Sequence, residues 1–164
     1  MSTPAQGQPL DERDARHLRR AIELSAEARR RGNAPFGAVI VGSDGKVLAE
    51  ARNTGSETDD FTAHAEMNAL RLVSGRHPRE VLAQATIYAS GEPCAMCAGG
   101  IFWSGISRVV FGLDIEGQQR AGKPPEIGLS CRHLLGAAPR PVEVLGPCLA
   151  QEAAVPFSGA WPRS

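Results

Sequence analysis

The sequence predicts an α/β fold in which one β-sheet is covered by helices on both faces. Two observations carry this prediction: segments of helical periodicity alternate with short apolar runs, and turn residues separate them. With 164 residues, 42% of them hydrophobic, the chain is long enough and apolar enough for one sizeable core. We therefore expect a flexible N-terminal tail over residues 1–10 and a single domain over residues 11–164.

The N-terminal half begins with an amphipathic helix. Small and apolar residues recur at helical spacing between Ala15 and Ala28, with Arg and Glu between them. Asp11 or Asp14 can cap its start, and Gly32-Asn33 can end it. Two predicted strands follow, at residues 36–41 and 46–51, with a hairpin turn at residues 43–45 between them. A polar loop is expected at residues 53–61.

The remaining elements also alternate between helix and strand. Gly112 opens a long stretch, residues 112–128, that we expect to be a loop because it holds glycines and a double proline. The predicted helices are residues 62–73, 94–103, 131–135 and 148–154, and the predicted strands are residues 85–89, 108–111 and 142–145.

Two short segments predict chemistry: Thr62-Ala-His-Ala-Glu66 and Glu92-Pro-Cys-Ala-Met-Cys97. Cys94 and Cys97 stand in the first turn of a predicted helix, where the dipole and the backbone N–H groups favour thiolates. His64, at the start of the other helix, can supply a third ligand to a zinc ion. Three protein ligands leave a position open for water, which is the pattern of catalytic zinc.

Glu66 lies two residues after His64, so it can face a zinc-bound water without ligating the metal. Its carboxylate can take a proton from that water and return it to a leaving amine. Other interpretations stay open. The cysteines could form a redox pair, zinc could be structural with a fourth ligand from Cys131, Cys148 or His133, and Glu66 could be a solvated helix residue.

With these motifs the chain resembles the cytidine deaminase-like superfamily, and within it the bacterial branch of guanine deaminases and tRNA adenosine deaminases. The resemblance covers residues 14–112 and is weak after Gly112. It implies a three-layer α/β/α sandwich with a mixed five-stranded sheet, one Zn²⁺ per subunit and a homodimer. The matching segments are Pro35–Val41, Asn53, Thr62–Leu70, Glu92–Gly100 and Val109–Gly112.

The resemblance also implies roles for residues around the zinc site. Asn53 would hydrogen-bond the base, and the Ala65 backbone N–H would face a carbonyl or ring nitrogen of it. Phe36 and Trp103 would pack on the face of the base or form a wall. The alternatives are an Asn that only turns the chain and aromatic residues that only fill the core.

In guanine deaminases of this family, an acidic residue of the long loop or the C-terminal tail of a subunit completes the pocket. None of the candidates here matches a family position. Each could instead be a solvated acid or part of a hydrophobic tail docked on its own core. The loop candidates are Asp114, Glu116 and Glu126, and the tail candidates are Phe157 and Trp161.

Segment Ile101–Gly105 resembles the guanine deaminase branch, in which an aromatic–Trp pair follows the cysteine helix. We therefore expect conversion of guanine to xanthine with release of ammonia. The alternatives are adenosine in tRNA, cytosine, a triazine or a pterin as substrate, and a catalytically silent zinc-binding partner subunit. Glu66 argues against the silent subunit, because silent relatives can dispense with this acid.

The charge balance argues against a nucleic-acid partner, because 18 basic and 18 acidic residues cancel, whereas proteins that bind polyanions usually carry a basic excess. No apolar run approaches the roughly 20 residues that span a bilayer. Residues 1–10 lack the apolar core of a signal peptide. We therefore expect a cytoplasmic enzyme of purine metabolism, with reduced cysteines, that acts on a small heterocycle.

Overall fold

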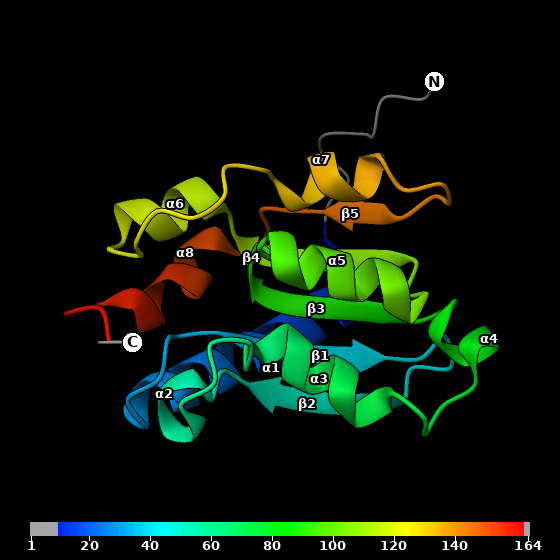
Figure 1. Cartoon of the computed structure of the whole chain (residues 1–164), viewed down its shortest axis with the longest axis horizontal. Coiled ribbons are helices and arrows are strands. Elements are labelled where there is room, and N and C mark those ends of the chain that lie inside the picture. The colour runs from blue at the N-terminus through cyan, green and yellow to red at the C-terminus, as the bar shows by residue number, and fades with distance from the viewer. Residues whose placement is uncertain (1–9, 163–164) are drawn as a thin grey trace.

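A computed structural model describes residues 10–162 of the chain. Five strands form one sheet in the order β2-β1-β3-β4-β5 (Figure 1). Strand β1 pairs antiparallel with both β2 and β3, whereas β3, β4 and β5 are parallel. The mixed five-stranded sheet is therefore confirmed. The strands are β1 (Gly37–Val41), β2 (Val47–Arg52), β3 (Thr86–Gly91), β4 (Arg108–Leu113) and β5 (Glu143–Leu145).

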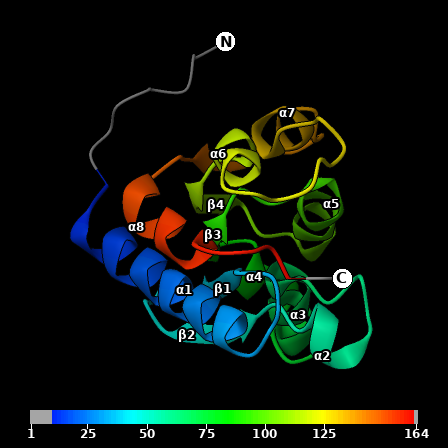
Figure 2. The same cartoon turned by 90° about the vertical axis from the view of Figure 1, so that its left-hand side faces the viewer.

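Helices cover both faces of the sheet, which confirms the three-layer α/β/α arrangement (Figure 2). Helices α1 (Glu12–Arg30) and α8 (Ala150–Ala154) lie on one face. Helices α3 (Ala65–Val73) and α5 (Ala95–Ser104) lie on the other, with α7 (Cys131–Gly136) packed against α5. Because both faces are covered, β1 is buried along its whole length and reads as a continuous apolar run.

Helix α1 begins and ends where its sequence signals predict. Asp11 is the N-cap, and its side chain accepts the backbone N–H of Asp14. Arg29 and Arg30 occupy the last turn, where their charge interacts favourably with the helix dipole. Asp14, the alternative cap, lies in the first turn of α1 and is buried.

Three short helices lie in segments for which the sequence predicted no regular structure. Helix α2 (Gly55–Thr58) interrupts the expected loop 53–61, and α6 (Ile115–Arg120) interrupts the expected loop 112–128. Helix α4 (Arg79–Leu82) lies between α3 and β3. Each has six residues or fewer, too few for helical periodicity to show. A 3-10 turn, η1 (Val155–Phe157), follows α8.

The core is divided by the sheet. A larger cluster fills the space between the sheet and α3, α5 and α7, and a smaller one lies beneath α1. None of the helices within residues 10–162 is long and apolar enough to cross a membrane. Residues 1–9 of the predicted tail lie outside the described residues, and the single domain over residues 11–164 stays a prediction.

Candidate active site and metal centre

The three predicted zinc ligands meet at the starts of two helices. His64 is the N-cap of α3, Cys94 is the N-cap of α5, and Cys97 lies in the first turn of α5. Neither cap side chain makes a capping hydrogen bond, so both are free to bind a ligand. The ligand atoms of the three residues all lie within 4.8 Å of one another.

The spacing of these atoms fits a tetrahedral zinc ion. His64 Nδ1 lies 3.5 Å from Cys94 Sγ and 3.5 Å from Cys97 Sγ. Zinc bonds of about 2.3 Å to sulfur and about 2.05 Å to nitrogen, at the tetrahedral angle, give an N···S edge of about 3.6 Å. Among residues 10–162, the possible ligand group contains neither Cys131, Cys148 nor His133. A fourth position is therefore left without a protein ligand.

The two thiols are placed to bind a cation. The contact with the Cys97 thiol lowers the pKa of Cys94 to about 3, and His64 lowers it further. The same contact, followed by burial, raises the pKa of Cys97. The contact between the two thiols thus favours one thiolate, and a divalent cation favours the loss of the second proton.

Glu66 lies in the first turn of α3, next to the ligand group. It is buried, with its Oε2 3.5 Å from Cys97 Sγ. Burial raises the pKa of this carboxyl group, because the charged form loses its hydration. A raised pKa makes the carboxylate a stronger base, which suits a residue that takes up and returns a proton.

The metal centre opens into a cavity of about 730 Å³, within the size range of small-molecule sites. Asn53 and Phe36 line it, together with His64, Glu66 and Cys94. The structure thus brings most of the predicted site residues to one place. Residues 55–61 around α2, the segment between α6 and α7 and the C-terminal tail also line it.

Asn53 turns the chain and also lines the cavity. Its Oδ1 accepts the backbone N–H of Gly55 at 2.9 Å, so it does turn the chain. Within residues 10–162 no hydrogen bond of its Nδ2 is found, and the residue lines the cavity. Ala65 is fully buried at the first position of α3, where backbone N–H groups have no intrahelical partner.

Phe36 also serves both packing and the cavity wall. It contacts Phe157 and Trp161 edge to face, with ring centroids 5.5 and 6.1 Å apart. Trp161 lines the cavity, and Phe157 is buried behind Phe36. The C-terminal tail of the chain therefore closes its own site, held by a hydrogen bond from Arg29 to the Ser158 carbonyl.

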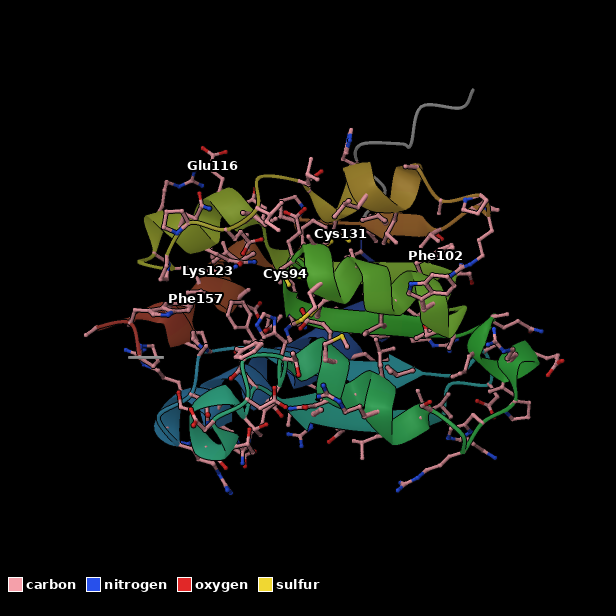
Figure 3. All side chains as sticks on the ribbon, in the orientation of Figure 1. Cys94, Phe102, Glu116, Lys123, Cys131 and Phe157 are labelled. Atoms are coloured by element: carbon pink, nitrogen blue, oxygen red, sulfur yellow. The ribbon has the colours of Figure 1, made fainter. Side chains whose placement is uncertain are left out.

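Three other candidates lie outside the cavity. Trp103 is 76% exposed on α5 and contacts Phe102, so it does not form the wall expected of it. Asp114 caps α6 by accepting the Gly117 N–H. Glu116 pairs with Arg120 and points outward (Figure 3). Of the acidic loop candidates, Glu126 lines the cavity.

The structure adds two residues to which the sequence motifs assigned no role. Glu92 is buried, and its carboxylate accepts the backbone N–H of Ile115 at 3.0 Å and that of Cys131 at 2.9 Å. It thereby ties the starts of α6 and α7 to the end of β3. Lys123 is the second, a cation on the cavity wall. The position of Glu92 directly before the Pro-Cys motif could have indicated a role near the site. No sequence pattern around Lys123 indicated such a role.

Comparison with known proteins also indicates a zinc-binding deaminase. Residues 11–113 match the family model of the cytidine and deoxycytidylate deaminase zinc-binding region. The chain is 43% identical over 156 residues to a probable cytosine deaminase of Schizosaccharomyces pombe, covering 93% of this chain and 94% of that protein. It is 38% identical over 106 residues to the guanine deaminase of Bacillus subtilis, covering 65% and 67%.

A solved structure in complex with 8-azaguanine has the same fold, with a TM-score of 0.77 and 22% identity over 92% of this chain and 84% of that one. The family model spans more than half of this chain, and the zinc predicted as its cofactor fits the three ligands found here. The chain therefore belongs to the zinc-binding cytidine and deoxycytidylate deaminase family of hydrolytic enzymes.

Proposed function

We propose that this enzyme removes the exocyclic amine from a free amino-purine base, converting guanine to xanthine with release of ammonia. One observation carries the proposal: a buried carboxyl group, Glu66, adjoins a three-ligand metal group at the floor of a cavity lined by an amide and aromatic rings. A zinc ion with three protein ligands supplies Lewis acidity and acidifies a water molecule in its fourth position.

The chain's own residues hold the base and move the protons. Asn53 Nδ2 donates to an acceptor atom of the base, and Phe36 and Trp161 pack against its ring. Glu66 takes one proton as water oxygen attacks the amine-bearing carbon, and delivers it to the adjacent ring nitrogen. It takes the second proton from the new hydroxyl group and delivers it to the nitrogen that leaves as ammonia.

The walls of the cavity favour a free base over a nucleic acid. Within residues 10–162, carboxylates outnumber cationic groups there, since Lys123 is the one lysine or arginine among the described lining residues. Phosphate groups would meet net repulsion at such a mouth. The carboxylates that line the cavity are Asp59, Asp60, Glu66, Glu92 and Glu126.

Cytosine is the second candidate substrate, because the Schizosaccharomyces pombe relative, a probable cytosine deaminase, matches over nearly the whole chain. The cavity volume admits a two-ring base as well as a one-ring base, so the substrate must be decided by assay. Ammonia release measured with guanine, adenine, cytosine and their nucleosides discriminates the two. Turnover of guanine above cytosine is expected, and the reverse ranking would replace guanine by cytosine.

The role of Glu66 has its own test. Glu66→Gln should retain zinc, because this residue is not among the three ligands, but should lose at least about a thousandfold in kcat. Glu116→Gln is the matched control, since its carboxylate is exposed and points away from the site. Activity of Glu66→Gln within tenfold of the parent protein would contradict the role.

A cytoplasmic homodimer is part of the same proposal. The exposed Trp103 ring on α5, which does not line the cavity, leaves an apolar surface that a second copy could cover. Light scattering of the purified protein measures the mass directly and would contradict the dimer if it gave about 17 kDa.

A further inference from the structure

The chain has two lysines, and they lie in opposite environments. Lys46 is 81% exposed beside the β1–β2 turn, whereas the side chain of Lys123 is 14% exposed. Lys123 follows α6 and lines the cavity together with Cys94 and Glu66. A lysine removed from water in this way needs partners that offset its lost hydration.

The Lys123 ammonium has three N–H donors, and the described residues occupy two of them. Nζ donates to Gln118 Oε1 at 3.1 Å and pairs with Glu126 Oε2. It also lies over the Phe36 ring, 5.6 Å from the centroid. One N–H donor therefore remains for a further acceptor.

Glu126 also has unused hydrogen-bonding capacity. Its Oε1 is buried, and within residues 10–162 no donor reaches it. A buried carboxylate oxygen without a donor is costly, so such atoms normally have a partner in the working state of a protein. Because this oxygen is closed off from the cavity, the Lys123–Glu126 pair offers a ligand one free N–H donor, that of Lys123.

A buried side chain, Gln118, holds the Lys123 ammonium in place. Gln118 is fully buried, and its Nε2 donates to the Leu113 carbonyl at 2.9 Å and to the Glu92 carbonyl at 3.3 Å. The ammonium is therefore anchored to the ends of β3 and β4, next to the metal centre. Burial lowers the pKa of Lys123, while the neighbouring carboxylates and thiols favour its charged form.

We propose that Lys123 determines specificity: it donates its free N–H to an acceptor ring nitrogen of the heterocycle. This inference rests on the proposed function. The five-membered ring of a free purine base carries one acceptor nitrogen, which matches this donor. A one-ring base has no five-membered ring, so a purine is selected.

Steady-state kinetics with two matched ligands test the proposal. Lys123→Met should raise KM for guanine about tenfold to a hundredfold, the size of one hydrogen bond to a charged group, with kcat changed much less. Wild-type protein should lose a similar factor when 7-deazaguanine, which lacks the acceptor nitrogen, replaces guanine. In Lys123→Met, the change from guanine to 7-deazaguanine should cause little further loss. Equal losses in both proteins would overturn the proposal.

Two further variants separate recognition from structure. Lys123→Arg keeps a charged donor and should recover most of the lost affinity, whereas Lys46→Met should leave KM unchanged. A structural role for Lys123 predicts a different result. Lys123→Met would then raise KM, Lys123→Arg would not restore it, and wild-type protein would have the same KM for 7-deazaguanine as for guanine. That result would show the proposal to be wrong.

Amine labelling gives a readout that does not depend on turnover. In wild-type protein loaded with zinc, millimolar 8-azaguanine should protect Lys123 from an amine-reactive reagent and leave Lys46 labelled as the internal control. Unchanged labelling of Lys123 would overturn the proposal. Absence of ammonia release from guanine would instead refute the proposed function, so the two failures are distinguishable.

Discussion

Replacing Glu92 with Gln should loosen the segment that closes the cavity. The carboxylate accepts two backbone N–H groups, from Ile115 at the start of α6 and from Cys131 at the start of α7. An amide has one oxygen and one NH₂ group, so it can satisfy one of these N–H groups and must turn a donor toward the other. Because Cys131 is fully buried, water cannot replace the lost acceptor there.

The magnitude follows from these contacts. A hydrogen bond to a charged group contributes about 1.5–3 kcal/mol, and a buried donor left unsatisfied costs about 1–3 kcal/mol. We expect Glu92→Gln to lower the free energy of unfolding by about 3 kcal/mol. For a chain of this length, that corresponds to a fall in Tm of about 6–12 °C.

Thermal unfolding followed by circular dichroism measures this effect, with zinc present in all samples. Glu116→Gln removes an exposed carboxylate from the same part of the fold and should change stability by less than about 0.5 kcal/mol. KM should also rise for Glu92→Gln, because the same segment carries Lys123 and Glu126. If Glu92→Gln unfolded within 1 °C of the parent protein, the anchoring role would be refuted.

Three further outcomes are expected. Arg108 and Tyr88 hydrogen-bond Asp14, and Arg108 does most to lower its pKa below 3.8, so the folded state favours the ionised form. The stabilisation by ionised Asp14 is complete above about pH 4 and is lost as the pH falls further. Asp14→Asn should therefore lower the free energy of unfolding by about 2 kcal/mol at pH 7 and by less at pH 3, as denaturant titrations can measure. Removal of zinc by a chelator should lower Tm reversibly, as calorimetry can measure. Compared with protein in free zinc at a hundred times its Kd, the free energy of unfolding should fall by about 2.7 kcal/mol. Trp161→Ala should raise KM about tenfold, because the ring lines the cavity. Trp103→Ala should change KM by less than about twofold, because this ring is exposed outside the cavity. Equal changes of KM in the two variants would contradict these placements.

Much of the fold could be predicted because its signals are local. Asp11 caps α1 through a hydrogen bond three residues along, and the alternation of helices and strands follows from side-chain periodicity. The elements that were missed, such as α6, have too few residues for periodicity to develop. Their position depends on tertiary contacts, as with the Glu92 carboxylate that binds the start of α6.

The metal ligands were predictable for the same reason. Cys94 and Cys97 lie three residues apart in the first turn of one helix, and His64 and Glu66 lie at the start of another. Residue spacing alone therefore orients each pair. Trp103 illustrates the opposite case, because α5 is apolar or small along its length and has no polar face to show which side meets the cavity.

Local spacing and motifs were enough to predict the zinc ligands, the adjoining carboxylate, the α/β class and the deaminase family. The residues that close the cavity became known from the packed structure: Trp161 and Glu126 line it, and Trp103 does not. The packing also places Lys123 as a cation on the cavity wall. These residues are far from the metal ligands in sequence, so no local pattern shows that folding brings them to the same cavity.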